Sequence, residues 1–171
     1  MSKQLTDYIT LGRSGLRVSP VSIGTMTFGK DWGWGATEED ARRMLDTYME
    51  RGGNFIDTAN FYTGGTSERL LGEFLRGRRD RAVLATKYSL NVDPTNINAG
   101  GNHRRNMVRA VEESLKRLGT DYIDLYYLHV WDETTPVEEV MRAFDDLVRA
   151  GKIVYAGISD TPAWQVARMQ M

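Results

Sequence analysis

Short apolar segments alternate along the chain with longer segments in which apolar residues recur every three or four positions. The short segments are typical of buried strands, and the periodic ones are typical of helices with one buried face. The expected strands cover residues 21–24, 54–57, 82–87, 123–128 and 153–158. A helix is expected after each strand, and a hairpin with a Gly-Arg-Ser-Gly turn is expected over residues 9–18.

Strands that alternate with helices predict a parallel sheet joined by right-handed crossovers. The expected strands are almost wholly apolar, which indicates that both faces of the sheet are covered. A closed barrel of eight strand–helix units takes ~250 residues, so 171 residues supply about five units. We therefore expect an α/β fold, an incomplete parallel (β/α) barrel of TIM type with an N-terminal β-hairpin. The alternative is an open sheet, and we expect residues 1–171 to form one domain.

Two helix starts carry explicit signals. Thr37 precedes a run of acidic residues, which suit the positive end of a helix. Thr135, Pro136 and Glu138 have the spacing of a capping box with proline at the first helical position. We therefore expect both threonines to cap the helices that follow them.

The composition is that of an ordinary globular protein, with 41% hydrophobic and 26% charged residues and a net charge of −1. A charge this close to zero, without a basic run, argues against nucleic acid as a partner. The absence of cysteine excludes disulfides and thiolate–metal sites and fits a reducing compartment, and no metal site is expected. No apolar run approaches the ~20 residues that span a bilayer. We expect a soluble, cytoplasmic protein with no membrane partner.

The candidate chemistry lies where the expected strands end. Asp57, Lys87 and His129 end three consecutive strands, and Tyr62 lies in the loop after the first of these. Each alone has an ordinary explanation, as a turn residue, a solvated strand end, a hydrogen-bonded core histidine or a packing phenol. Because the carboxyl ends of barrel strands meet at one rim, we expect the four side chains to share one pocket.

These four groups together suit proton transfer to an oxygen. A tyrosine hydroxyl is a weak acid at neutral pH, and a neighbouring ammonium such as Lys87 stabilises the phenolate form. Asp57 can pair with Lys87 and offset the cost of its burial, and His129 can orient the substrate oxygen. Carbonyl reduction, with hydride supplied by a cofactor, needs such a proton donor.

Several stretches match the aldo-keto reductase family in the family's order and cover almost the whole chain. They are residues 24–29, 54–62, 67–72, 86–87, 121–129 and 151–159. The chain resembles the N-terminal part of an aldo-keto reductase, and its Thr-Met-Thr-Phe-Gly stretch is closest to the branch with aryl-alcohol dehydrogenase-like enzymes and potassium-channel β subunits. The resemblance implies an NAD(P)H-dependent (β/α)8-barrel oxidoreductase that reduces an aldehyde or ketone to an alcohol.

The resemblance also implies roles for individual residues. The catalytic tetrad falls on Asp57, Tyr62, Lys87 and His129, with Tyr62 as the proton donor. The cofactor contacts fall on Gly24, Thr25, Met26, Asp57, Ser159 and Asp160. Asp160 stands where many members have Asn, and an ionised carboxylate cannot donate a hydrogen bond as an amide does. Trp32 and Trp131 are the expected walls of the substrate pocket. NADP(H) is the family's default cofactor, and NAD(H) is the alternative.

Alternatives to a working reductase remain open at this point. Barrels commonly bind phosphate after their seventh and eighth strands, which this chain does not reach, so weak or absent activity is one expectation. A non-catalytic cofactor-sensing or interaction subunit of the channel-β type, or an inert remnant, is the second hypothesis. A small open α/β domain of unrelated function is the third, and it requires chance motif matches. Open barrel edges further predict self-association or a second chain that completes the barrel.

Overall fold

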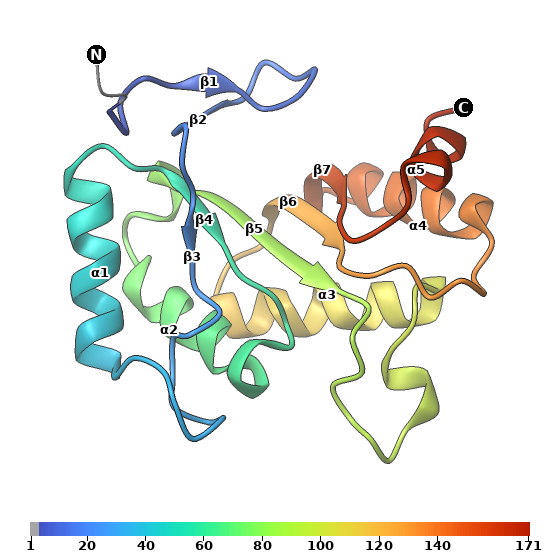
Figure 1. The fold of residues 1–171 in the computed structure, drawn as a ribbon, viewed down its shortest axis with the longest axis horizontal. Coiled ribbons are helices and arrows are strands. Elements are labelled where there is room, and N and C mark those ends of the chain that lie inside the picture. Colours follow the sequence, from blue (N-terminus) through green and yellow to red (C-terminus); the bar gives the residue numbers. More distant parts are fainter. Residues whose placement is uncertain (1–3) are drawn as a thin grey trace.

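The computed structural model describes residues 4–171 and contains a parallel five-stranded sheet (Figure 1). Each strand lies beside its successor, in the order β3-β4-β5-β6-β7. The strands are β3 (Ile23–Gly24), β4 (Phe55–Asp57), β5 (Val83–Tyr88), β6 (Ile123–Leu128) and β7 (Ile153–Ile158). Sequential order with a helix between neighbours is the arrangement of a (β/α) barrel, so the expected fold is confirmed as an arc of such a barrel.

An antiparallel hairpin precedes the sheet, as expected, and consists of β1 (Ile9–Thr10) and β2 (Arg17–Val18). Its turn faces one side of the sheet, and a cavity of about 670 Å³ lies between the turn and the strands. The sheet residues that line this cavity include Leu125, Tyr127 and Tyr155. These alternate positions of β6 and β7 therefore face the inside of the arc.

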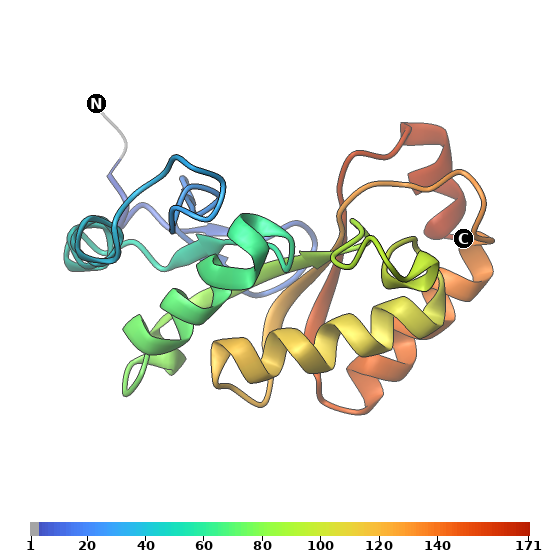
Figure 2. The ribbon, with the colours of Figure 1, turned by 90° about the horizontal axis from the view of Figure 1, so that it is seen from below.

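Helices cover the opposite face of the sheet. They are α1 (Glu38–Glu50), α2 (Thr66–Phe74), α3 (Arg104–Leu118) and α4 (Val137–Arg149). The last helix, α5 (Ala163–Met169), packs against α4. Figure 2 shows α2, α3 and α4 along one side of the strands. The core lies between them, where Tyr88 and Tyr126 stack at 5.3 Å and Phe144 of α4 meets both ring edges. The strands are thus held from outside, which leaves their carboxyl ends free to carry chemistry.

One of the two expected helix caps is wrong. Thr37 does cap α1, because its Oγ1 accepts a hydrogen bond from Asp40 N at 3.1 Å. No side chain caps α4, and the Thr135 hydroxyl instead donates to Asp132 Oδ2 at 2.7 Å. The helix begins at Val137 with Pro136 as its N-cap, one residue later than the expected start, so Thr135 does not stand at the cap position. The hydrogen bond to Asp132 is not the obstacle, since Thr37 also donates to a carboxylate, Asp40 Oδ2 at 2.9 Å, while it caps α1.

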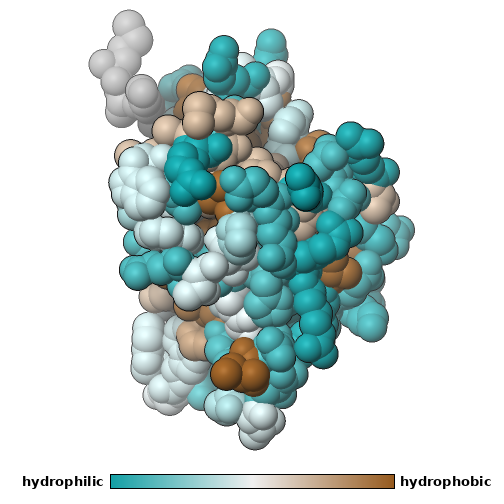
Figure 3. All heavy atoms as spheres, turned by 90° about the vertical axis from the view of Figure 1, so that its right-hand side faces the viewer, coloured by the Kyte–Doolittle hydropathy of each residue, from teal (hydrophilic) through white to brown (hydrophobic). Residues whose placement is uncertain are grey.

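The surface over α4 and α5 is mainly hydrophilic, with hydrophobic residues scattered singly (Figure 3). Within residues 4–171, β3 and β7 are the end strands of the sheet, and Val154 of β7 is 45% exposed. Pairing of these edges with a further chain stays a prediction. The part of the chain that the structure describes holds no helix both long and apolar enough to cross a membrane.

Candidate active site

The sheet register brings the predicted tetrad to one edge. Asp57 of β4 lies opposite Ala85 of β5, so Lys87 is one side-chain step further along the same face. His129 follows β6, and its backbone N–H donates to Tyr88 O at 2.9 Å. Three neighbouring strands therefore present their carboxyl ends together.

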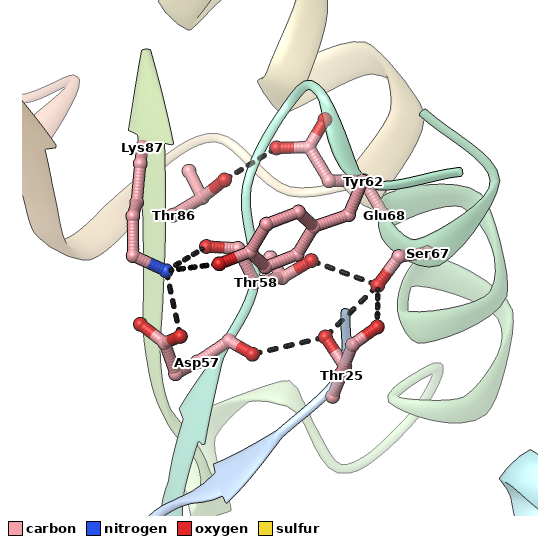
Figure 4. A network of polar contacts seen from close by, with 8 residues as sticks. All are labelled: Thr25, Asp57, Thr58, Tyr62, Ser67, Glu68, Thr86 and Lys87. Carbon is pink, nitrogen blue, oxygen red and sulfur yellow. Dashed lines mark hydrogen bonds and ion pairs between the residues drawn. The ribbon is translucent and has the colours of Figure 1, made fainter. Parts of the chain in front are cut away.

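Lys87 is the centre of the site and is only 7% exposed. Its Nζ donates to Asp57 Oδ2 at 2.6 Å, to Thr58 O at 2.7 Å and to Tyr62 Oη at 3.3 Å (Figure 4). An ammonium has three protons, so these three acceptors satisfy it fully. The charge of Lys87 is balanced by Asp57, and its position is fixed against Tyr62.

A strained turn aims Tyr62 at this ammonium. Tyr62 opens the 3₁₀ helix η1 (Tyr62–Gly65), and the next residue, Thr63, has a φ of 48°. That left-handed conformation is uncommon outside glycine, and the buried Thr63 hydroxyl holds it by donating to Phe28 O at 2.7 Å. The Tyr62 ring then lies 4.9 Å from Lys87 Nζ and meets the His129 ring edge-on at 5.8 Å.

His129 is held in its neutral form. Its burial lowers the pKa below 6.5, and the nearby Lys87 cation lowers it further, against smaller opposing effects of Asp57 and Asp160. The imidazole is therefore neutral at pH 7 and has one N–H donor and one acceptor nitrogen. Its Nδ1 is buried and has no hydrogen-bond partner within residues 4–171.

A second layer of polar side chains lies beneath the tetrad. Ser67 Oγ lies 2.9 Å from the hydroxyls of both Thr25 and Thr58. The fully buried Glu68 accepts hydrogen bonds from Thr86 and Arg117, both at 2.6 Å. In the sequence, Ser67 and Glu68 stand out only as part of the family match over residues 67–72. Ser67 shares its buried helix face with apolar residues four and seven positions later, and that was a signal of a buried polar role.

The expected cofactor residues surround the same rim. Thr25 is fully buried, and its hydroxyl and its backbone N–H both donate to Asp57 O at 2.9 Å, so the structure leaves neither its side chain nor its backbone exposed. Gly24 pairs with Asp57 across the sheet, and Met26 is 44% exposed. Ser159 N donates to Leu128 O at 2.9 Å, which places this residue beside His129.

Two further observations concern Asp160 and the expected pocket walls. Asp160 is exposed, has a φ of 39°, and accepts a hydrogen bond from Trp131 N at 3.3 Å. Trp32 packs 6.0 Å from Phe61, the neighbour of Tyr62, and Trp131 packs edge-on at 5.5 Å from Trp164. Trp131 also lines a cleft of about 440 Å³ between the segments after β5 and β6. Their contacts with cofactor and substrate stay predictions.

Two reciprocal hydrogen bonds, which the sequence did not predict, join the segment after β5 to the segment after β6. We call this pair the clasp between Asn102 and Asp132. Asn102 N donates to Asp132 Oδ2 at 2.7 Å, and Asp132 N donates back to Asn102 Oδ1 at 2.8 Å. Burial alone raises the pKa of Asp132, but the hydrogen bonds from Asn102, Thr134 and Thr135 outweigh it and hold the pKa below its usual value. The ionised carboxylate thus ties one wall of the cleft to the other.

Comparison with known proteins identifies the family. A sequence profile described as "Aldo/keto reductase family" matches residues 20–171. The norsolorinic acid reductase of Aspergillus flavus is 51% identical over 165 residues, which covers 91% of this chain and 42% of that protein. The aryl-alcohol dehydrogenase [NADP(+)] of Phanerodontia chrysosporium is 44% identical over 168 residues, which covers 90% of this chain and 44% of that protein.

A solved structure agrees with these relatives. The holo form of aldo-keto reductase AKR11C1 from Bacillus halodurans matches with a TM-score of 0.83 and 36% identity, over 94% of this chain and 52% of that chain. The chain spans less than half the length of the curated relatives named above. It belongs to the aldo/keto reductase family.

Proposed function

We propose that this polypeptide reduces an aldehyde or ketone to an alcohol with NADP(H), and that Tyr62 donates the proton. The observation that carries the proposal is the hydrogen bond of Lys87 Nζ to Tyr62 Oη at 3.3 Å, inside a site where Lys87 is also fixed by Asp57. Membership of the family supports an oxidoreductase. The name of the aryl-alcohol dehydrogenase [NADP(+)] supports NADP(H) and suggests an aromatic substrate.

The proton transfer follows from the charges around Tyr62. As negative charge builds on the substrate oxygen, Tyr62 Oη gives up its proton, and the Lys87 ammonium stabilises the phenolate that remains. Neutral His129 can donate a hydrogen bond to the same oxygen and hold it against Tyr62. Asp57 keeps Lys87 in place without touching the substrate. A reduced nicotinamide supplies the hydride when it is bound.

Unpartnered polar atoms support a polar ligand at this rim. His129 Nδ1, Trp131 Nε1 and Asn60 Oδ1 are buried without a hydrogen-bond partner in the described part of the chain. Buried polar groups are normally paired, so such a group of orphans favours a ligand or water that pairs with them.

Tyr127 provides a matched control for the proton donor. Burial raises its pKa, and the nearby Asp57 carboxylate raises it further, so it is a poorer acid than free tyrosine. Tyr62→Phe is expected to lower the rate of NADPH oxidation with an aromatic aldehyde ~10²–10⁴-fold, the usual contribution of a general acid. Tyr127→Phe is expected to keep the wild-type rate within a few-fold.

The assay follows absorbance at 340 nm, and NADPH fluorescence reports binding separately. Equal turnover by wild type and Tyr62→Phe would show that Tyr62 is not the proton donor. NADPH binding without turnover of any aldehyde or ketone would instead favour a cofactor-sensing protein over an enzyme.

A further inference from the structure

Ser67, in the first turn of α2, connects the ends of two neighbouring strands beneath the site. Its hydroxyl donates to Thr25 O at 2.8 Å and lies 2.9 Å from the hydroxyls of Thr25 and Thr58. All three side chains are completely buried. Figure 4 shows them on the side of Asp57 and Tyr62 away from Lys87. No water reaches these hydroxyls, so their hydrogen bonds depend on one another.

The direction of these hydrogen bonds follows from counting protons. The Thr25 hydroxyl donates to Asp57 O at 2.9 Å, and the Ser67 hydroxyl donates to Thr25 O. Each hydroxyl has a single proton, so the Thr58 hydroxyl is left to donate to Ser67 Oγ. Ser67 therefore both accepts and donates, and an alanine at this position can do neither.

These hydrogen bonds act on the two residues that hold Lys87, Asp57 and Thr58. Thr58 uses its carbonyl to accept a hydrogen bond from Lys87 Nζ at 2.7 Å, while its hydroxyl is held by Ser67. Asp57, whose carboxylate pairs with Lys87 at 2.6 Å, has its own carbonyl held by Thr25. Ser67 thus restrains both residues that fix the ammonium against Tyr62.

We infer that Ser67 is a positioning residue for Lys87, acting through Thr58 and Thr25 without touching the substrate. The catalytic part of this inference rests on the proposed function. Loss of the Ser67 hydroxyl frees Thr58 and Asp57 to shift, and Lys87 shifts with them. Because a misplacement of about 1 Å in a catalytic group can cost ~10²-fold in rate, Ser67→Ala is expected to lower kcat about tenfold to a hundredfold with KM nearly unchanged.

Ser19 supplies a matched control at the other end of β4. It is also a buried serine whose hydroxyl makes several hydrogen bonds, two of them with Asn54 at 2.9 and 3.1 Å. Ser19→Ala removes the same group at similar burial but lies at the amino end of the strand. We expect it to lower stability as Ser67→Ala does and to leave kcat unchanged.

A readout that needs no turnover separates this inference from the proposed function. A buried ammonium with three fixed acceptors exchanges its protons slowly, so the Lys87 side chain should give a ¹H–¹⁵Nζ cross-peak, assigned by its loss in Lys87→Met. In Ser67→Ala of the full chain, this cross-peak should shift or broaden, and in Ser19→Ala it should stay at its wild-type position. If the cross-peak moves but no variant turns over a substrate, the inference holds and the proposed function fails.

Thr58→Val tests the same contact from its other side. It removes only the hydroxyl that donates to Ser67 and keeps the carbonyl that Lys87 uses. It should move the Lys87 cross-peak in the same direction as Ser67→Ala but no further, because Ser67→Ala also removes the hydrogen bond to Thr25 O. The double variant should add little to Ser67→Ala, since that change already removes the contact with Thr58. An unchanged Lys87 cross-peak in folded Ser67→Ala and Thr58→Val, with kcat equal to that of Ser19→Ala, would overturn the inference.

Discussion

The buried ion pair between Glu68 and Arg117 joins α2 to α3 and should be a large contributor to stability that depends on both partners. Arg117 Nε lies 2.6 Å from Glu68 Oε2, with the Glu68 side chain fully buried and that of Arg117 21% exposed. Replacing Arg117 with Met keeps most of the aliphatic stem and removes the charge. Glu68 then retains only the Thr86 hydroxyl as a side-chain donor.

The expected cost of Arg117→Met follows from this burial. Removing one partner of a buried pair costs ~3–5 kcal/mol, because it leaves an uncompensated charge. Since the Arg117 side is partly open to water, the expected loss in free energy of unfolding is about 2–3 kcal/mol. Urea denaturation at pH 7, followed by far-ultraviolet circular dichroism, measures this difference.

Arg149 provides the control for ion pairs as such. Its Nε lies 2.8 Å from Asp145, almost the same distance, but the two side chains are 77% and 56% exposed. Arg149→Met should cost less than about 1 kcal/mol. The double variant with Glu68→Gln and Arg117→Met should recover part of the loss, because no buried charge remains unpaired. A loss in Arg117→Met no larger than that in Arg149→Met would refute the reasoning.

Three further predictions test other parts of the structure. A Cβ on Gly72 would lie 2.6 Å from Arg117 O, so Gly72→Ala should lower the free energy of unfolding by about 1–3 kcal/mol in urea denaturation, whereas Gly15→Ala, with nothing within 4 Å, should be nearly neutral. The pKa of the Asp132 carboxyl is lower in the folded state than in the unfolded state, where it is ~3.9. Its ionised form therefore stabilises the fold above the unfolded-state pKa, and this contribution is lost as the pH falls through the folded-state pKa. The stability difference between wild type and Asp132→Asn should therefore shrink below about pH 4, and a constant difference would contradict this. The pKa of His129, followed by NMR, should rise in Lys87→Met because one of the two causes that lower it is removed, and an unchanged value would argue against their coupling.

The convergence of Asp57, Lys87 and His129 could be predicted because it follows from the fold pattern, and their catalytic roles stay predictions. Short apolar runs end at Asp57 and His129, and a third ends beside Lys87, so the topology of a parallel barrel brings these side chains together whatever the loops do. The structure brings Tyr62 to the same point. The direction of the Tyr62 side chain depends on the left-handed backbone of Thr63, which the hydrophobic pattern does not predict.

The supporting contacts could not be predicted, because their partners lie far apart in the sequence. Ser67 and Glu68 stand out in the sequence only as part of the family match, while their partners Thr25 and Arg117 lie 42 and 49 positions away. The capping box at Thr135 was misread because the helix start was placed one residue too early. Proline was expected at the first helical position, but Pro136 is the N-cap of α4 and the helix begins at Val137.

Deuterium transfer tests the central claim most directly. NADPH carrying deuterium at the transferred C4 position is incubated with the protein and an aromatic aldehyde, and the alcohol is examined by mass spectrometry. Wild type and Tyr127→Phe should both give alcohol with one deuterium on the carbinol carbon, while Tyr62→Phe should still bind NADPH and give almost none. Deuterated alcohol formed at the same rate by Tyr62→Phe, or by none of the three proteins, would contradict the account.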